Sequence, residues 1–86
     1  MFEVILSPEA KTFYAAADPP LARKLARCFA QLERDPRRHN NIKRLSGEMA
    51  GLSRYRVGDW RLLFRLDDAA ARVHVLVIAH RSEVYE

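Results

Sequence analysis

Cysteine is nearly absent from this sequence: Cys28 is the single cysteine among 86 residues, so no disulfide can form within the chain. The three histidines, His39, His74 and His80, are scattered, and together with Cys28 they show no zinc-ligand spacing. We therefore expect no metal, no redox chemistry and no small-molecule cofactor.

Long hydrophobic runs are also missing. The longest uninterrupted aliphatic stretch, Val75 to Ala79, is far shorter than the roughly 20 apolar residues that cross a bilayer. The N-terminal MFEVILSPEA has neither the charged segment nor the long apolar segment of a secretory signal. We therefore expect a soluble, cytoplasmic protein with no membrane partner.

What the sequence does contain is typical of a small globular domain. Hydrophobic residues make up 49% and charged residues 30%, which argues against a disordered chain. A chain of 86 residues has room for one core, so we expect a single domain over residues 1–86. The net charge of +4 favours an anionic partner such as nucleic acid or an acidic protein, although a basic soluble surface is an equally simple interpretation.

The first part of the chain predicts a strand followed by two helices. Residues 2–6, FEVIL, are strand formers and end at Ser7-Pro8, a helix-capping pair, which predicts a first helix over residues 8–17. Asp18-Pro19-Pro20 ends that helix and begins a second one, which runs to about residue 35. The apolar residues of this second helix recur at helical spacing and predict its buried face: Leu21, Leu25, Cys28, Phe29 and Leu32.

The second part predicts strands. Residues 36–51 are rich in turn formers and bases, which predicts a loop with Ile42 and Leu45 pinned to the core. Residues 52–57 and 60–66 alternate as an antiparallel hairpin around Gly58-Asp59, and residues 72–80 form a further strand in the sheet interior. The predicted fold is α+β, in the order β-α-α-β-β-β, with a helix hairpin on one face of a four-stranded, mostly antiparallel sheet.

The predicted hairpin brings like charges together. If Gly58-Asp59 is the whole turn, Arg56 lies opposite Arg61 with Arg54 diagonal to them, and such pairs are destabilising. The guanidiniums either splay apart into solvent or converge on an anion. They could also pair with acids, for which the candidates are Glu48, Glu83 and Glu86.

The last strand is followed directly by AHRSEVYE, residues 79–86. His80 and Arg81 must emerge at one end of the sheet, but periodicity does not determine whether Arg61 lies at that end. If it does, one site would contain Arg54, Arg56, Arg61, His80, Arg81 and Tyr85.

Two segments carry a resemblance to a known family. LSGEMAGLSRYRVGDWRLLFRL, residues 45–66, followed by VLVIAHRSEVYE, residues 75–86, resembles the RelE branch of the RelE/ParE toxin superfamily, and the likeness covers nearly the whole chain. The resemblance implies a RelE-like microbial RNase fold and a cognate antitoxin in a type II toxin-antitoxin system. It also implies an mRNA interferase, an endoribonuclease that inhibits translation by cleaving mRNA on the ribosome.

Roles for individual residues follow from the same resemblance. Arg54 and Arg56 match positions that hold the RNA backbone, and Arg61 and Arg81 match catalytic arginines. Tyr85 matches the tyrosine that stacks on, or protonates near, the scissile step. For the neighbouring basic loop, RNA binding is expected of Lys43 and Arg44.

The general base is less well defined. Metal-free attack of a ribose 2′-OH on the adjacent phosphate needs preplaced cations, a base and an acid. Arginine is a poor base because its pKa of about 12.5 or more keeps it protonated. His80 is therefore the better candidate for the base, since histidine has an unperturbed pKa of about 6.5, with Tyr85 or Arg81 as the acid.

Two other functions share this fold. A ParE-like toxin would inhibit DNA gyrase by protein contact and cut nothing. An inactive module would only bind an antitoxin and regulate transcription. The arginine set favours the nuclease, because the gyrase branch does not need it.

Overall fold

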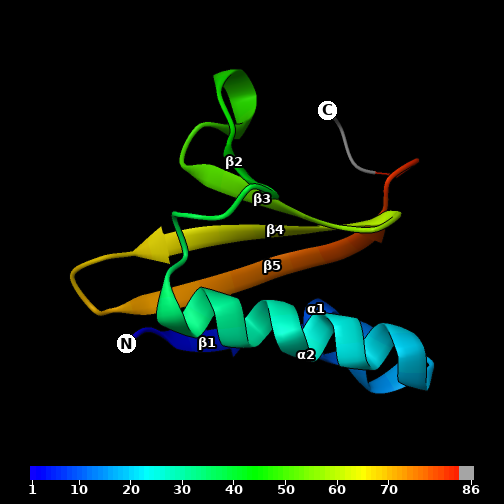
Figure 1. The fold of residues 1–86 in the computed structure, drawn as a ribbon. Helices are drawn as coiled ribbons and strands as arrows, with labels where there is room; N and C mark the ends of the chain where they lie inside the picture. Colours follow the sequence, from blue (N-terminus) through cyan, green and yellow to red (C-terminus); the bar gives the residue numbers. More distant parts are fainter. Residues whose placement is uncertain (84–86) are drawn as a thin grey trace.

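The computed structural model describes residues 1–83. Its elements follow in the order β1 (Glu3–Leu6), α1 (Pro8–Ala16), α2 (Pro19–Arg34), β2 (Ile42–Arg44), the 3-10 helix η1 (Gly47–Met49), β3 (Leu52–Val57), β4 (Trp60–Asp67) and β5 (Arg72–His80). Figure 1 shows α1 and α2 side by side on one face of the sheet, whereas η1 rises from the other side. No helix within residues 1–83 has the length and hydropathy needed to cross a membrane.

The strands form one mixed sheet in the order β1-β5-β4-β3-β2. The pair β1 and β5 is parallel and the other pairs are antiparallel. The α+β class, the helix hairpin on one face and the interior position of residues 72–80 are thus confirmed. The sheet has five strands where four were predicted, because β2 lies in the segment predicted to be a loop. Its three residues are too few to show a periodicity, and their pairing with β3 defines them.

Both helices begin where the sequence predicted: α1 at its predicted cap Ser7, and α2 at Asp18-Pro19-Pro20. The Ser7 hydroxyl oxygen accepts a hydrogen bond from the Ala10 N–H at 3.0 Å. The same hydroxyl donates to the Leu76 carbonyl oxygen at 2.7 Å, which ties the start of α1 to β5. Asp18 caps α2 by accepting from the Leu21 N–H at 3.1 Å. Side-chain caps at both N-termini satisfy backbone donors that the helices leave unpaired.

A bulge in β5 explains why the Leu76 carbonyl oxygen can accept a hydrogen bond from Ser7, the cap of α1. Phe64 of β4 pairs with Val75, and the preceding residue, Leu63, pairs with Val77, so Leu76 has no register partner in β4. A bulged residue leaves the ladder locally. The Leu76 carbonyl oxygen accepts the Ser7 hydroxyl instead.

The core fills the space between the helices and the sheet. Its fully buried large side chains are Phe64, Leu25, Leu32, Leu62, Val73 and Val75. Cys28 is also buried there, as predicted, and interacts with Tyr55 of β3. Burial raises the pKa of the Cys28 thiol and, together with the neighbouring thiol, the pKa of the Tyr55 hydroxyl, because both charged forms lose hydration.

Candidate functional site

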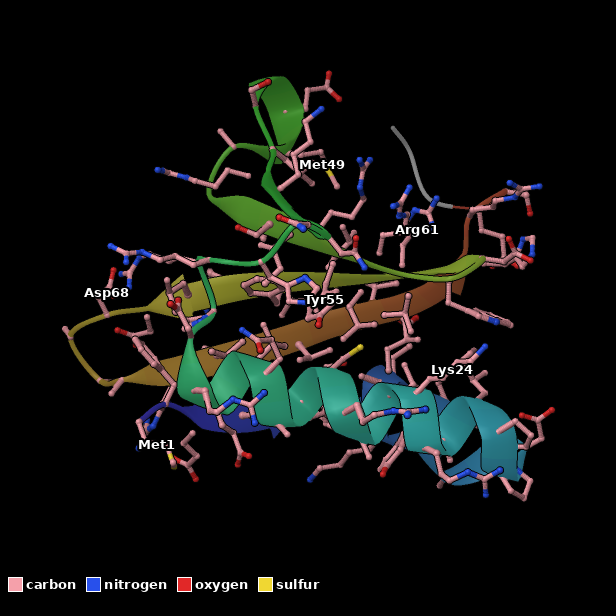
Figure 2. All side chains as sticks on the ribbon, in the orientation of Figure 1. Met1, Lys24, Met49, Tyr55, Arg61 and Asp68 are labelled. Carbon is pink, nitrogen blue, oxygen red and sulfur yellow. The ribbon has the colours of Figure 1, made fainter. Side chains whose placement is uncertain are left out.

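The face of the sheet that the helices leave uncovered carries the predicted arginines. The register pairs Arg56 with Arg61 and Arg54 with Leu63, which confirms the predicted hairpin. Tyr55, which lies between Arg54 and Arg56 in β3, points to the opposite face and packs in the core. We call the surface formed by Arg54, Arg56 and Arg61 the arginine face, and Figure 2 shows Arg61 projecting from the sheet on the side away from α2.

Arg61 is the most enclosed of the three, because only 8% of the residue's surface is exposed. Its Nη1 group donates to the carbonyl oxygens of Gly58 at 3.0 Å and Trp60 at 2.9 Å. On the β5 side, Arg61 pairs with Ala79, whose small side chain leaves room for the Arg61 guanidinium. The hairpin turn therefore fixes one edge of the Arg61 guanidinium.

Arg56 is exposed, and its contacts hold it toward Asn41, next to β2. Its Nη2 group lies 3.5 Å from the Asn41 side-chain oxygen, and its backbone N–H donates to the Asn41 carbonyl oxygen at 2.9 Å. Arg56 is thus held toward Asn41 on the β2 side, and Arg61 is held by the turn. This arrangement explains how two like charges tolerate opposite positions in the ladder.

Arg81 lies at the same end of the sheet as Arg61, which settles the strand-order question. The pairs Trp60 with His80 and Arg61 with Ala79 place the end of β5 beside the start of β4. The Arg81 N–H then donates to the Asp59 carbonyl oxygen at 2.8 Å, and its Nε lies 3.9 Å from the Asp59 carboxylate. Both side chains are mostly exposed. The Gly58-Asp59 turn thus contacts both predicted catalytic arginines.

His80 does not join the arginine face. It pairs in register with Trp60, whose side chain belongs to the core face, and their rings meet edge to face with centroids 5.3 Å apart. The His80 Nδ1 also lies 3.0 Å from the Ser82 hydroxyl oxygen. The expectation that His80 would line one site with Arg61 does not match this register, because neighbouring strand residues alternate between faces.

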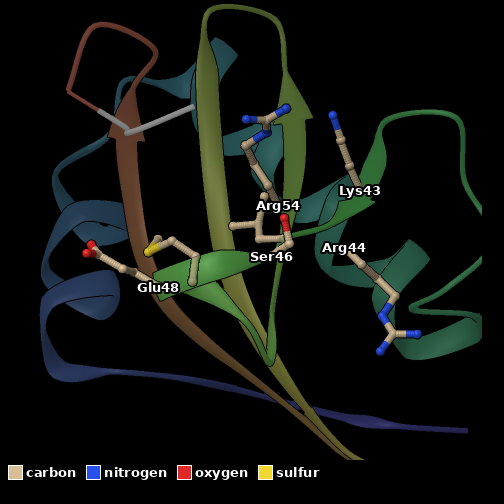
Figure 3. A pocket seen from close by; sticks show the side chains of 7 residues that line it. Lys43, Arg44, Ser46, Glu48 and Arg54 are labelled. Atoms are coloured by element: carbon tan, nitrogen blue, oxygen red, sulfur yellow. The ribbon is translucent and has the colours of Figure 1, made fainter.

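The basic loop contributes one cation to this face and directs another elsewhere. Lys43 pairs in register with Arg54, and Figure 3 shows both side chains extending in the same direction from β2 and β3. Arg44 follows Lys43 in β2, so its side chain starts from the opposite face of the strand, and it points away from Lys43 and Arg54 in Figure 3. It lines the pocket that Lys43 and Arg54 also line, and on its other side a second pocket that includes Asp68. Lys43 is therefore brought to the arginine face, and Arg44 is not.

Tyr85 lies outside the described residues, so its predicted place stays a prediction. Among residues 1–83, no group of three or more histidine, cysteine, aspartate or glutamate side chains could hold a metal ion. The structure also adds features that sequence reasoning missed. They are Asn41 beside Arg56, the Gly58 carbonyl that holds Arg61, and the pocket next to Arg54 that η1 helps to form. Gly47 and Gly51, which have positive φ, were the signal for a defined turn there.

Comparison with known proteins finds similar toxins. The model of a family described as the ParE toxin of type II toxin-antitoxin systems, parDE, matches residues 4–85. Toxin RelG of Mycobacterium tuberculosis is 39% identical over 69 residues, which are 78% of this chain and 77% of that relative.

Solved structures agree in fold. The toxin-antitoxin complex RelBE2 of Mycobacterium tuberculosis matches with a TM-score of 0.79 and 31% identity, over 93% of this chain and 98% of that chain. The archaeal RelE-RelB complex of Pyrococcus horikoshii matches with a TM-score of 0.82 and 18% identity, over 96% and 98% of the two chains. Because the family model spans nearly all of the sequence, this chain belongs to the ParE toxin family of the RelE/ParE superfamily and is a toxin of the type II toxin-antitoxin class.

Proposed function

We propose that this toxin is a ribosome-dependent endoribonuclease that cleaves mRNA. The observation that carries the proposal is the fixed guanidinium of Arg61 on a sheet face shared with Arg54 and Arg56, with Arg81 at the same strand end. A ParE-type function through protein contact alone does not need such a set.

The proposed reaction uses the 2′-OH of the substrate as the nucleophile. The 2′-oxygen forms a bond to the adjacent phosphorus while the bond from phosphorus to the 5′-oxygen breaks. A base takes the 2′-OH proton and an acid protonates the departing 5′-oxygen, so the products are a 2′,3′-cyclic phosphate and a 5′-OH. Negative charge builds on the phosphoryl oxygens in the transition state, where fixed cations stabilise it most.

The residues of the arginine face suit particular parts of this reaction. Arg61, held by two turn carbonyls, would stabilise the transition state with little reorganisation, since its orientation is set before the substrate arrives. Arg81 would supply the second cation, and Tyr85 would act at the scissile step. The RNA backbone would be held by Lys43, Arg54 and Arg56.

None of the arginines takes the proton from the 2′-OH, because arginine stays protonated in proteins. His80 packs against Trp60 on the opposite face, so we assign it a packing role at the end of β5. The ribosome would then orient the 2′-OH for in-line attack. Such orientation of the reacting groups can remove a large part of the activation barrier. We accordingly expect purified protein to cut naked RNA poorly, and efficient cutting of free RNA would contradict ribosome dependence.

An antitoxin partner and a cytoplasmic location follow from the proposal. Structural neighbours were solved as complexes of a RelE-type toxin with RelB, and of YoeB with YefM. We propose an equivalent antitoxin for this chain. Because the proposed substrate is mRNA on the ribosome, we propose that the toxin acts in the cytoplasm.

The test is induction of the toxin in cells, followed by primer-extension mapping of mRNA 5′ ends. We expect cuts within codons of translated messages, and loss of these cuts in a variant carrying Arg61→Ala and Arg81→Ala. A variant carrying Arg23→Ala and Arg27→Ala is the matched control, because it removes the same charge from the exposed face of α2. Undiminished toxicity of the Arg61 and Arg81 double variant would overturn the proposal.

A second candidate function is gyrase inhibition, which is favoured by the ParE description of the matching family model. In that case induction would stall replication while mRNA stays intact, and purified toxin would inhibit DNA supercoiling by gyrase. A chain that shows neither activity but binds its antitoxin would be the regulatory module.

A further inference from the structure

An open pocket lies beside the arginine face, where β2 and β3 meet η1. The residues that line it are Lys43, Arg44, Leu45, Ser46, Glu48, Met49 and Arg54. Figure 3 shows the cationic side chains on one side of the pocket and Glu48 on the other. The pocket therefore has a basic wall, an apolar centre and an acidic wall.

The basic wall is a cross-strand pair. Lys43 and Arg54 are register partners, and Figure 3 shows their charged ends extending in the same direction. Arg54 precedes Arg56 by two residues on one strand face, which is a separation of about 7 Å along β3. An RNA strand that places its scissile phosphate at Arg61 would therefore pass this pair with a neighbouring nucleotide.

The remaining walls have the chemistry of a nucleobase site. Leu45 and Met49 are half-buried, and a thioether adapts its shape to a flat aromatic surface. Glu48 is exposed and lies in the first turn of η1. A carboxylate accepts hydrogen bonds from the exocyclic amino group of a base, as it does from cytosine. Uracil has no exocyclic amino group, and the two carbonyl oxygens that flank its N3–H repel a carboxylate.

We propose that this pocket binds the base of a nucleotide adjacent to the cut and selects against uracil. The phosphate of that nucleotide lies on Lys43 and Arg54, its base contacts Leu45 and Met49, and Glu48 accepts from its exocyclic amino group. This inference rests on the proposed mRNA cleavage, whose substrate it specifies.

Mapping of cut sites across the transcriptome tests the inference. The wild type is expected to disfavour uracil at one position within two nucleotides of the cut. Glu48→Gln should raise the ratio of uracil to cytosine there about tenfold, because a carboxamide can also donate to a uracil carbonyl. Glu33→Gln is the matched control, since Glu33 is an exposed carboxylate on α2, and it should leave the ratio unchanged.

The possible outcomes separate the two proposals. If the wild type makes no cuts, the proposed nuclease function fails and the pocket loses its substrate. If the wild type cuts without disfavouring uracil, or if Glu48→Gln leaves the ratio unchanged, only the pocket inference is overturned.

A binding measurement gives an independent readout on the full chain. Titration with CMP, UMP or inorganic phosphate would be followed by backbone amide chemical shifts in residues 45–49. CMP should shift these amides and bind about tenfold more tightly than UMP, and Glu48→Gln should remove that difference. Equal responses to CMP and to inorganic phosphate would mean a simple anion site and would overturn base recognition.

Discussion

The guanidinium of Arg61 is fixed by the turn before its own strand, with Nη1 donating to the Gly58 carbonyl oxygen at 3.0 Å. Gly58 has a φ of +60°, a conformation that favours glycine, and as the first residue of a two-residue hairpin turn it matches a type II′ pattern. The glycine that shapes the turn thus also directs a carbonyl at the arginine. This relationship couples the local geometry of the hairpin to the placement of the central charge.

The first prediction concerns this geometry. Arg61→Lys keeps the charge but loses the planar fork, so cleavage should fall by about 10²–10³-fold. Loss of the turn contacts should also lower the free energy of unfolding by about 1 kcal/mol. Arg65→Lys is the control, because Arg65 is exposed on the same strand face, and it should keep both values. Equal cleavage by the two variants would rule out an oriented guanidinium.

Arg81 should affect activity and leave stability nearly unchanged. Its ion pair with Asp59 joins two side chains that are 63% and 69% exposed, and such pairs contribute little to folding. We expect Arg81→Ala to lower cleavage at least about tenfold while urea denaturation shifts by less than about 0.5 kcal/mol. Asp59→Asn keeps the backbone bond from the Arg81 N–H and should retain cleavage. A large loss of stability in Arg81→Ala would show a structural role instead.

His80 should behave as a packing residue. Its edge-to-face contact with Trp60 is of a kind worth about 0.5–1.5 kcal/mol, so His80→Gln should destabilise the fold by about that amount. Cleavage should fall less than about tenfold, with the same dependence on pH as the wild type. His74→Gln, on the same strand, is the comparison variant. A change in the pH dependence of cleavage in His80→Gln alone would instead identify His80 as the general base.

The helix starts and the hairpin register could be predicted from the sequence because each depends on local chemistry. Ser7 and Asp18 cap their helices through hydrogen bonds to N–H groups three residues later, and a two-residue turn leaves one register for Arg56 opposite Arg61. These features follow from the chain within a few residues. They could therefore be predicted without the tertiary fold.

The features that sequence analysis missed depend on contacts between distant segments. β2 is recognised by its pairing with β3, and the side of the sheet on which His80 lies depends on its register with Trp60 of β4. The sequence analysis grouped His80 with Arg61 on the condition that both lie at the same end of the sheet. Alternation along the paired strands places them on opposite faces.

The buried pair of Cys28 and Tyr55 predicts a loss of stability at alkaline pH. Burial raises the pKa of the Cys28 thiol, so above about pH 8.5 the unfolded chain releases a proton that the folded chain retains. The free energy of unfolding therefore falls as pH rises through that range, and Tyr55, whose pKa is also raised, adds to the fall at higher pH. Cys28→Ala should reduce this slope in urea denaturation between about pH 8 and 10.5. A difference between wild type and variant that does not change with pH would contradict this assignment.

The turn between β4 and β5 predicts a stabilising substitution. Ala71 has a φ of +54°, where a Cβ atom is unfavourable, whereas its backbone N–H and carbonyl oxygen make hydrogen bonds that glycine would keep. Ala71→Gly should therefore raise the free energy of unfolding by about 0.5–1 kcal/mol, after the greater freedom of glycine in the unfolded chain is subtracted. Ala70→Gly is the matched control, because Ala70 lacks a positive φ, and it should be neutral or destabilising. Thermal denaturation of the three proteins decides the point, and a lower melting temperature for Ala71→Gly than for the wild type would contradict the strain assigned to Ala71.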